Sequence, residues 1–331
     1  MNPLERGRIG RTDVYVTKLG LGTSGLGGTY GPVPVEQAVA TVRRAFQLGM
    51  NYFDTAPQYG LGRAERILGS VLPTLPRSEF VLSTKVGKSF EDERSDGGWH
   101  FDLSGAGVTK SLEDSCQRLG LTNVDIAFIH DPYQNHLEAI EEAYPVLVEK
   151  RSEGIIRGIG AGMEQWEMEL ELAKERSFDC FLLAGPYTLL EQGALDRFLP
   201  FCLEKGISVI IGAPYQWGNL LDTKRVLSAK RTYRRVKRVL GLESQPAQQE
   251  TPEQLRIKRI RRFCKEHDVP IKAVALQFPL AHPAVVSVIP GGRSPGEVEE
   301  NFQMAKHEIG RSFWKQLKEA ELVDPRAPVP E

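Results

Sequence analysis

The most restrictive feature of this sequence is its alternation of short apolar or β-branched runs with longer amphipathic segments, which is typical of βαβ units and a parallel sheet. After an N-terminal hairpin around residues 14–18, eight runs are predicted to be strands: 19–22, 51–54, 80–84, 125–130, 156–160, 179–183, 208–211 and 285–289. Helical periodicity occupies the segments 35–48, 63–72, 108–119, 137–153, 165–176, 194–205, 254–267 and 294–305, and a short helix is predicted at 313–322.

The number of strand–helix units decides between two folds. A length of 331 residues alone would allow about two domains. No low-complexity linker divides the chain, and eight units fit one closed (β/α)8 TIM barrel over residues 1–331 better than two doubly wound domains. The segments 86–107 and 212–252 are long insertions after the third and seventh strands, where βα loops build the active-site face of a barrel.

Charge and cysteine usage narrow the classes of function. With 42 Lys and Arg against 43 Asp and Glu, the chain has no overall attraction for nucleic acid or an anionic membrane, and we expect neither as a partner. The four cysteines are scattered, without a C-x-x-C pair or zinc-site spacing, so no metal site is predicted. Residues 1–13 are polar and no long apolar window follows, which predicts a cytoplasmic protein.

A glycine-rich segment follows the first predicted strand. Gly20, Gly22 and Gly25 form G-x-G-x-x-G, a pattern found in dinucleotide-binding motifs. Pro32 and Pro34 follow, no helix is expected to open on the third glycine, and no acidic residue ends a second strand about 20 residues later. We therefore favour a tight turn at the barrel mouth, where the backbone approaches a ligand closely, over a Rossmann motif.

Ionisable residues stand at the ends of three successive predicted strands. Asp54, Lys85 and His130 occur in NYFDT, VLSTKV and IAFIHD. The carboxyl ends of barrel strands converge on one mouth, and the loop TAPQYG is short enough to return Tyr59 to it. The sequence therefore predicts one pocket with all four side chains. Each residue alone also has a structural interpretation: the Asp caps the next segment, the Lys is a solvated loop residue, the Tyr packs against neighbours, and the His is a core residue.

Together these four groups predict proton transfer at a carbonyl or alcohol oxygen. A phenol has a pKa of about 10 in water, which is too high for easy proton exchange at neutral pH. The adjacent Lys85 ammonium favours the phenolate of Tyr59. Asp54 compensates the buried charge of Lys85, and His130 orients the substrate oxygen. None of these side chains delivers hydride, so a nicotinamide cofactor is implied as the two-electron partner.

The segments NYFDTAPQYG with AERILG, STKVG and DIAFIHDPY resemble the three signature regions of the aldo-keto reductases, in order and spacing over almost the whole chain. The resemblance implies a (β/α)8 barrel with an N-terminal hairpin, NAD(P)-linked chemistry, and a catalytic tetrad of Asp54, Tyr59, Lys85 and His130. Within the family, GTSGLGGTYGPV, LAGPYTLLEQ, LQFPLAHPAVVSVIPGGRSP and FWKQLKEAELV are similar to L-fucose or D-threo-aldose 1-dehydrogenases, L-galactose dehydrogenases and a pyridoxal 4-dehydrogenase. That similarity implies oxidation of a cyclic aldose at C1 to the lactone, with NAD⁺ as acceptor.

The resemblance places the adenosine end of the cofactor on residues 288–301. Many NADPH-dependent members carry a Lys and a later Arg there for the 2′-phosphate, whereas this chain has Gly291 and Glu297. A carboxylate repels a phosphate and accepts from a ribose hydroxyl, so NAD is expected over NADP, with Arg293 as a remaining cation. The implied cofactor contacts are Gly22, Thr23, Asp54, Tyr215, Gly291, Gly292, Arg293, Glu297 and Asn301.

Two other family contacts do not carry over. Gly162 and Met163 stand where many members place a Ser-Asn pair against the nicotinamide carboxamide. Gly212 stands where an aromatic residue often stacks on the nicotinamide ring, and Tyr215 or Trp217 is the alternative for that contact.

Aromatic residues in the βα loops are candidates for the substrate side. Tyr30 and Trp99, with His130, are the predicted substrate contacts, and Tyr133 lies on another such loop. Aromatic faces pack against the C–H faces of a sugar, although ordinary loop packing explains these residues equally well. The expected partner is a small sugar or aldehyde.

The segment 222–238 contains eight basic residues and one acidic residue. A solvated helix face, a loop that closes on the cofactor pyrophosphate and a nucleic-acid patch are all open interpretations. For the whole chain, a general aldehyde or ketone reductase and a pyridoxal 4-dehydrogenase are alternatives to the aldose 1-dehydrogenase. A non-catalytic, cofactor-binding regulatory subunit is the alternative from a different class.

Overall fold

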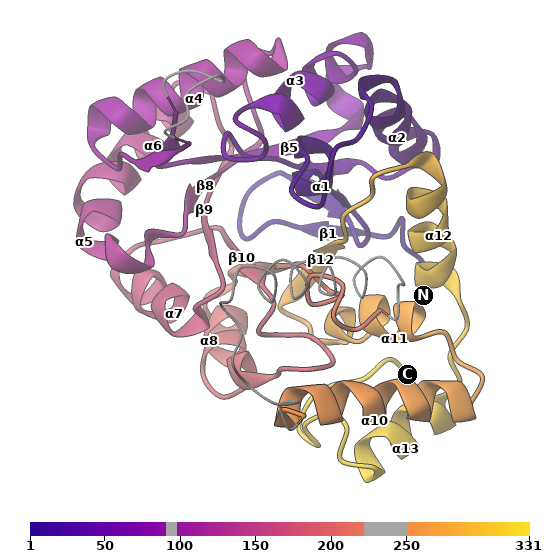
Figure 1. The fold of residues 1–331 in the computed structure, drawn as a ribbon. Coiled ribbons are helices and arrows are strands. Elements are labelled where there is room, and N and C mark those ends of the chain that lie inside the picture. The colour runs from indigo at the N-terminus through magenta and orange to yellow at the C-terminus, as the bar shows by residue number, and fades with distance from the viewer. Residues whose placement is uncertain (91–97, 222–249) are drawn as a thin grey trace, which may run out of the picture.

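Eight parallel strands form a ring in the computed structural model, which describes residues 1–90, 98–221 and 250–331 (Figure 1). The strands pair in the order β3 (Leu21–Gly22), β4 (Tyr52–Asp54), β5 (Val81–Val86), β8 (Ile126–His130), β9 (Gly158–Met163), β10 (Cys180–Ala184), β11 (Ser208–Gly212) and β12 (Val285–Ile289). The remaining gap between β3 and β12 is spanned by the Gly20 N–H, which donates to the Val288 carbonyl at 2.9 Å, and by a bridge between Gly22 and Gly291. The eight predicted strands and the (β/α)8 barrel are confirmed.

The helices lie outside the ring, largely where helical periodicity predicts them. They include α2 (Val35–Gln47), α3 (Arg63–Gly69), α4 (Gly105–Leu119), α6 (Tyr144–Ser152), α7 (Trp166–Glu175), α8 (Phe198–Lys205), α10 (Pro252–Glu266), α11 (Ile271–Gln277), α12 (Pro295–Lys306) and α13 (Arg311–Glu319). Late in the chain, α12 packs against α2, so the helical layer also joins its end to its beginning (Figure 1). The outlying helices α10 and α13 pack through Phe263 and Phe313, whose ring centres are 5.3 Å apart.

The amphipathic segment 137–153 is not one regular helix. It is divided into α5 (His136–Glu138), the π-helical turn η4 (Ala139–Ala143) and α6. Pro145 has no N–H to donate to a preceding carbonyl, so the regular hydrogen-bond pattern cannot run through this point. The predicted helical segment is therefore present over residues 136–152, with a π-helical turn inside it.

A short helix, α1 (Ser24–Gly27), begins inside the glycine-rich segment, which corrects the expectation that no helix opens there. Gly28 ends it with a φ of 100°, a conformation that suits glycine. A Cβ on Gly27 would lie 2.6 Å from the carbonyl carbon of Tyr59, and a Cβ on Gly60 would lie 2.1 Å from the oxygen of Gly27. The close approach that these glycines permit is therefore with the loop that carries Tyr59.

The interior of the barrel is filled from the amino ends of the strands. The predicted hairpin is present as β1 (Arg6–Arg8) paired with β2 (Tyr15–Thr17), and its apolar residues join a buried cluster that includes Phe128 and Leu182. The Ser208 hydroxyl, at the start of β11, donates to the Arg8 carbonyl at 2.8 Å. Apolar packing thus occupies one end of the barrel and leaves the carboxyl ends of the strands for polar groups.

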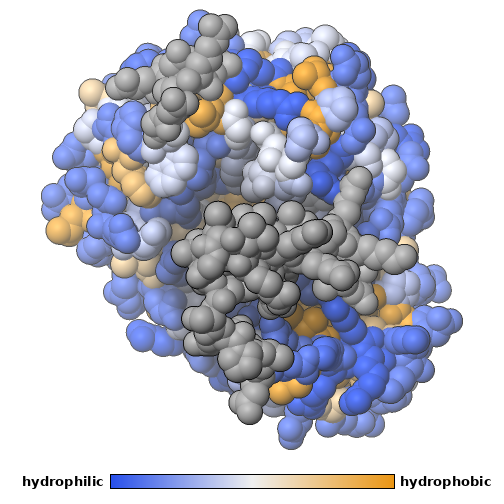
Figure 2. All heavy atoms as spheres, viewed as in Figure 1, coloured by the Kyte–Doolittle hydropathy of each residue, from blue (hydrophilic) through white to orange (hydrophobic). Residues whose placement is uncertain are grey.

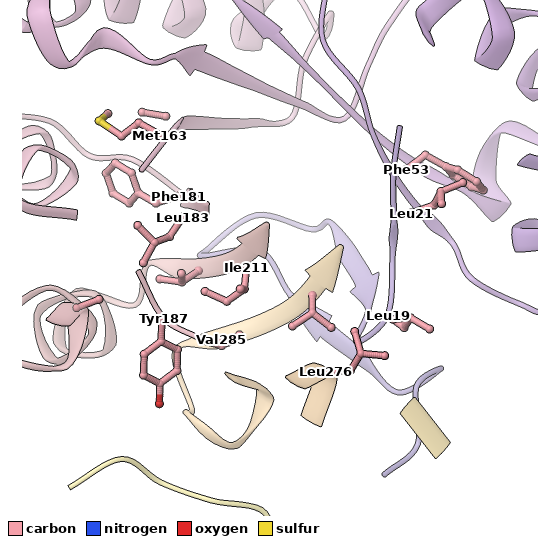
Figure 3. Close-up of a cluster of buried hydrophobic side chains, with 14 of the residues drawn as sticks. Leu19, Leu21, Phe53, Met163, Phe181, Leu183, Tyr187, Ile211, Leu276 and Val285 are labelled. Atoms are coloured by element: carbon pink, nitrogen blue, oxygen red, sulfur yellow. The ribbon is translucent and has the colours of Figure 1, made fainter. Parts of the chain in front are cut away.

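A second and larger hydrophobic cluster lies between the strands and the helices. Figure 3 shows Leu183, Ile211 and Val285, which come from three neighbouring strands, together with Tyr187. These outward-facing residues are buried by the helices, as the alternation of faces along a strand requires.

The two long insertions differ in how much of them is described. After β5, β6 (Lys88–Ser89) pairs in antiparallel fashion with β7 (His100–Phe101), and Lys88 lies opposite Phe101. After β11, residues 213–221 form a loop, whereas the basic segment 222–238 lies outside the described residues. The interpretations of that segment therefore stay untested.

Figure 2 shows a largely hydrophilic face in the same view as Figure 1. Within the described ranges, no helix combines the length and the apolar composition needed to cross a bilayer. The same part of the chain has no group of three or more His, Cys, Asp or Glu residues placed to hold a metal ion. All four cysteines are free thiols; Cys116 is half-buried and the other three are buried.

Candidate active site

The ionisable residues predicted at the barrel mouth lie together there. Asp54 ends β4, Lys85 is the last residue but one of β5, and His130 ends β8. Strand pairing sets Asp54 opposite Ser83 and Lys85 opposite Phe128, so these three neighbouring strands end at similar levels. The side chains of Asp54, Lys85 and His130 are all buried. Barrel topology alone therefore gathers groups that are far apart in sequence.

Lys85 and Asp54 form a buried ion pair. The Lys85 Nζ lies 2.7 and 2.9 Å from the two Asp54 oxygens and also donates to the Thr55 carbonyl at 2.8 Å. Burial lowers the pKa of Lys85, but attraction by Asp54 and Tyr59 outweighs it, so the pKa lies above its ordinary value. Lys85 is therefore an ammonium at neutral pH, held in one position by three hydrogen bonds.

Asp54 is itself fixed by two residues that the sequence analysis did not identify. The Ser83 hydroxyl donates to Asp54 Oδ2 at 2.8 Å, and the Tyr52 hydroxyl lies 3.0 Å from Ser83 Oγ. Ser83 is two residues before Lys85, on the same side of β5, and this spacing is the one sequence signal that points to it. The buried carboxylate is thus supported by a chain of hydrogen bonds.

Tyr59 is carried by the short loop after β4, where its N–H donates to the Ala56 carbonyl at 3.1 Å. The Lys85 Nζ is 4.9 Å from the centre of its ring, and the ring is perpendicular to that of His130 at a centroid distance of 6.2 Å. Burial raises the pKa of Tyr59, and the charge and hydrogen bond of Lys85 oppose this only in part, so the pKa lies above its ordinary value. The expected direction of the Lys85 effect is confirmed, but a net shift toward phenolate is wrong because desolvation has the larger effect.

His130 is neutral. Its side chain is buried, and among the described residues Nδ1 has no hydrogen-bond partner. Burial lowers the pKa of His130 well below its ordinary value, and the positive charges of Lys85 and Lys88 lower it further. A neutral imidazole carries one N–H, so His130 can donate a hydrogen bond to a substrate oxygen without adding charge.

Small residues stand at or next to the ends of the three strands that follow β8 in the sheet. Gly162 in β9 pairs with His130, and Ala184 in β10 pairs with Gly212 in β11. A Cβ on Gly162 would lie 3.3 Å from Leu182 Cβ, and one on Gly212 would lie 3.1 Å from Leu182 Cδ2. The Leu182 side chain therefore packs beside both glycines, and nothing larger than a methyl group projects from Gly162, Ala184 and Gly212.

Three of the predicted cofactor residues form one hydrogen-bonded group. The Tyr215 hydroxyl donates to Asn301 Oδ1 at 2.7 Å, and Asn301 Nδ2 donates to the Gly291 carbonyl at 3.1 Å. Among the described residues, a Cβ on Gly291 would meet only the Gly22 oxygen, at 3.9 Å. This open stretch of backbone precedes the N-terminus of α12, and helix N-termini attract phosphate groups. These residues fit a dinucleotide.

Arg293 and Glu297 are paired. The Glu297 carboxylate accepts from the Arg293 N–H at 2.9 Å and lies 3.4 Å from the guanidinium, which also donates to the Tyr30 carbonyl at 3.2 Å. The structure thus places Tyr30, expected on the substrate side, beside Arg293, because the loop after β3 turns toward α12. The positive charge of Arg293 is therefore paired with the Glu297 carboxylate.

The remaining predicted cofactor residues hold the rim of the mouth together. Both the N–H and the hydroxyl of Thr23 donate to the Asp54 carbonyl, at 3.0 and 2.9 Å, and the Gly22 N–H donates to the Pro290 carbonyl at 3.1 Å. A Cβ on Gly292 would lie 2.7 Å from a methyl carbon of Val298, so Gly292 lets α12 pack closely. These contacts join β3, β4 and β12.

The loop after β11 leans over the end of β10. Trp217 contacts Gly185, where a Cβ would lie 2.9 Å from the indole, and Gln216 donates to the Gly185 carbonyl at 2.8 Å. Ala213, Gln216 and Trp217 have φ values of 46°, 50° and 50°. Non-glycine residues rarely adopt this conformation, so tertiary contacts hold a strained loop at the mouth.

A second lysine lies beside the tetrad and was not identified from the sequence. Lys88 is 4% exposed, forms an ion pair with Asp131, and donates to Gln58 Oε1 at 3.2 Å. Its Nζ is 4.4 Å from the centre of the Trp99 ring, which places the predicted substrate residue Trp99 at this part of the mouth. Lys88 lies in an insertion without periodicity, so no sequence pattern indicates its burial.

The chain is similar to known proteins over almost its whole length. The model of the aldo/keto reductase family matches residues 18–322. The chain is 34% identical to a pyridoxal 4-dehydrogenase from Microbacterium luteolum, over 96% of this chain and 98% of that protein. It is 33% identical to a D-threo-aldose 1-dehydrogenase from a Pseudomonas species (93% and 95% covered) and 34% identical to an L-galactose dehydrogenase from Arabidopsis thaliana (91% and 88% covered).

Among solved structures, an aldo-keto reductase from Bacillus halodurans in its holo form has the same fold, with a TM-score of 0.78, 24% identity, and coverage of 99% of this chain and 98% of that chain. The chain belongs to the aldo/keto reductase family, as its signature regions indicate. It is therefore an oxidoreductase of the class that binds NAD(P)(H) and acts on aldehydes, ketones and alcohols.

Proposed function

We propose that this protein is an aldose 1-dehydrogenase of the L-fucose or D-threo-aldose type, which oxidises a cyclic sugar at C1 to the lactone and prefers NAD to NADP. We also propose that residues 1–331 form one barrel domain. The similarity to an aldose and a galactose dehydrogenase, at 33% and 34% identity over more than nine-tenths of this chain, supports the substrate class.

The observation that carries the proposal is the position of Lys85 between Asp54 and Tyr59. An ammonium held by a buried carboxylate, 4.9 Å from the centre of a phenol ring, stabilises the phenolate whenever the phenol gives up its proton. No purely structural role requires a buried lysine, a buried tyrosine and a neutral histidine at one mouth.

In the proposed oxidation, the phenolate of Tyr59 accepts the proton of the C1 hydroxyl, and Lys85 compensates the negative charge before that transfer. His130 donates its N–H to the same oxygen and orients it. A bound NAD⁺ would supply the acceptor for the hydride of C1. The adenosine end would be held by Gly291, Gly292 and Asn301. In the reverse direction Tyr59 donates its proton to the carbonyl oxygen.

The NAD preference is supported by the pair of Glu297 and Arg293. A 2′-phosphate needs an available cation, but Glu297 lies 3.4 Å from the Arg293 guanidinium and accepts from the Arg293 N–H at 2.9 Å. A dianionic 2′-phosphate would have to displace or tolerate this carboxylate. A ribose hydroxyl has no such conflict, since a carboxylate accepts its hydrogen bond.

The proposal is tested by measuring NAD⁺ and NADP⁺ reduction in parallel with L-fucose, D-arabinose, L-galactose and pyridoxal. We expect turnover with at least one aldose and faster turnover with NAD⁺. Pyridoxal is the second candidate, because a pyridoxal 4-dehydrogenase is 34% identical over 96% of this chain. Turnover of pyridoxal alone would replace the aldose assignment, and tight cofactor binding without turnover of any substrate would favour a regulatory subunit.

A further inference from the structure

The buried Lys88 links three segments around the active site. It lies on β6, forms an ion pair with Asp131 directly after His130, and donates to Gln58 directly before Tyr59. On the β6–β7 hairpin its Nζ is 4.4 Å from the centre of the Trp99 ring and 5.4 Å from that of Phe101. An ammonium framed by two aromatic faces and two acceptors is fixed in position beside both Tyr59 and His130.

Asp131 is held in a strained conformation at this point. Its φ is 49° and its ψ is 48°, and its N–H donates to the Gly162 carbonyl at 2.9 Å. A non-glycine residue in this region costs free energy, so surrounding contacts must maintain it. The result is that the Asp131 carboxylate lies at the mouth, with Oδ2 paired to Lys88 and 3.8 Å from His130 Nε2.

Both members of the pair have hydrogen-bonding capacity that the described residues do not use. An ammonium has three N–H donors, and within the described ranges Lys88 has acceptors for two of them, on Gln58 and Asp131. In the same ranges no donor reaches Oδ1 of Asp131, whose side chain is 28% exposed. One unused donor and one unused acceptor therefore stand next to each other, beside the His130 ring.

We propose that Lys88 and Asp131 form a hydroxyl-binding site that selects polyhydroxylated substrates over simple aldehydes. This inference rests on the proposed function and specifies its substrate class. Lys88 donates to one hydroxyl oxygen and Asp131 accepts from a neighbouring hydroxyl, on C2 and C3, the two carbons that follow the reacting C1. Trp99, which is 37% exposed, supplies the apolar face against which the C–H groups of such a substrate pack.

The chemistry favours this role over simple loop bracing. A site built to hydrogen-bond a substrate hydroxyl rejects the analogue without it, because its polar groups are then left unpaired. A brace would need only the two contacts that Lys88 already makes. A partly exposed carboxylate next to the reaction centre is instead placed to meet a hydroxyl group that arrives with the substrate.

The test compares NADH-dependent reduction of D-glyceraldehyde and propanal, which differ only by two hydroxyl groups. We expect wild-type protein to have the higher kcat/KM for glyceraldehyde. Lys88→Met should lower the ratio of the two kcat/KM values roughly 10- to 100-fold, the loss expected for one or two charge-assisted hydrogen bonds. Propanal reduction should fall less than glyceraldehyde reduction in this variant, and NADH affinity should stay within about threefold of wild type.

Two further variants make the result decisive. Asp131→Asn keeps the volume and tolerates the left-handed conformation, so it tests the pair even if Lys88→Met does not fold, and it should lower the same ratio. Lys150→Met is the matched control, since Lys150 is paired with Glu153 at 2.9 Å on α6 and its side chain is 13% exposed. The ratio should not change in that variant.

Other outcomes overturn the inference. If wild type shows no preference for glyceraldehyde, or if both variants slow the two aldehydes equally, Lys88 and Asp131 do not bind substrate hydroxyls. If wild type reduces neither aldehyde and oxidises no aldose, the proposed function fails as well. The wild-type rates alone therefore separate the failure of the proposed function from failure of the hydroxyl-binding site.

Discussion

The Lys85 ammonium contacts both oxygens of Asp54, at 2.7 and 2.9 Å, in a pair whose side chains are each 2% exposed. Two charges removed from water in this way lose much of their attraction to desolvation, so the pair is a poor means of stabilising a fold. Its value is positional, because it holds a cation beside Tyr59 at a fixed height in the barrel.

Removal of one partner of this pair should be costly. We expect Asp54→Asn to lower the free energy of unfolding by about 3 kcal/mol, because Lys85 would keep a buried charge without a counter-ion. The double variant, with Asp54→Asn and Lys85→Met together, should lose less free energy of unfolding than Asp54→Asn alone. Urea denaturation measures both. Asp114→Asn, in the exposed pair with Lys110, is the control and should change stability by less than about 0.5 kcal/mol.

Tyr59→Phe should separate binding from chemistry. The variant keeps the ring and its position but has no transferable proton, so kcat should fall by at least about 100-fold. The affinity for NAD⁺, measured by titration of protein fluorescence, should stay unchanged. Retention of wild-type turnover would remove Tyr59 from the proposed mechanism.

The pH dependence of oxidation should report the raised pKa of Tyr59. The phenolate is the reactive form, so kcat/KM should rise about tenfold per pH unit through the neutral range and level off only in alkaline solution. Since Lys85 lowers the pKa of Tyr59, Lys85→Met should move the plateau to still higher pH. A profile that is flat from neutral pH upward in wild type would contradict this assignment.

The positions of the four tetrad residues were predictable because parallel strands end at one mouth, a rule that depends only on strand order. The roles of Ser83 and Tyr52 were not, since the contact of Ser83 with Asp54 and that of Tyr52 with Ser83 depend on strand register, which residue pattern leaves undetermined. The contacts of Lys88 come from the β6–β7 hairpin and from two loops, one of which contains the left-handed Asp131. Loop geometry set by tertiary contacts has no local sequence signal.

The lack of a local sequence signal for tertiary contacts also explains the other corrections. Tyr30 follows a glycine-rich segment whose path is set by Gly27 and Gly60 in mutual contact, so its approach to Arg293 could not be read from spacing. The net pKa of Tyr59 depends on burial, which the sequence does not quantify. Strand and helix positions, by contrast, follow from periodicity, and the eight strands lie within a few residues of prediction.

Replacement of Glu297 should change the cofactor preference. Glu297→Gln frees the Arg293 guanidinium and removes the charge that opposes a 2′-phosphate, so the ratio of kcat/KM for NADP⁺ to that for NAD⁺ should rise roughly tenfold. Glu299→Gln is the control, because Glu299 lies on the same helix but pairs with Arg44 at 2.6 Å. An unchanged ratio in Glu297→Gln would show that the carboxylate does not set the preference.

Glu169, on α7, is a buried carboxyl outside the tetrad. Its Oε1 accepts from the Met163 N–H at 3.3 Å, while Oε2 has no partner among the described residues. Burial raises the pKa of Glu169 well above its ordinary value of 4.5, and the nearby charge of Asp131 acts in the same direction. The folded protein therefore keeps this proton under conditions in which the unfolded chain loses it.

This proton makes stability depend on pH. The contribution of Glu169 is complete below pH 4.5 and is lost as the pH rises through the raised pKa of the folded state, because unfolding releases a proton over that interval. Glu169→Gln keeps the acceptor for Met163 and has no proton to lose, so its stability relative to wild type, measured by urea denaturation, should increase as the pH rises from about 5 toward the raised pKa of Glu169. Glu171→Gln, two residues away, exposed and paired with Lys174 at 2.7 Å, should run parallel to wild type above pH 5. A constant difference between Glu169→Gln and wild type across this range would mean that Glu169 ionises in the folded protein as it does in the unfolded chain.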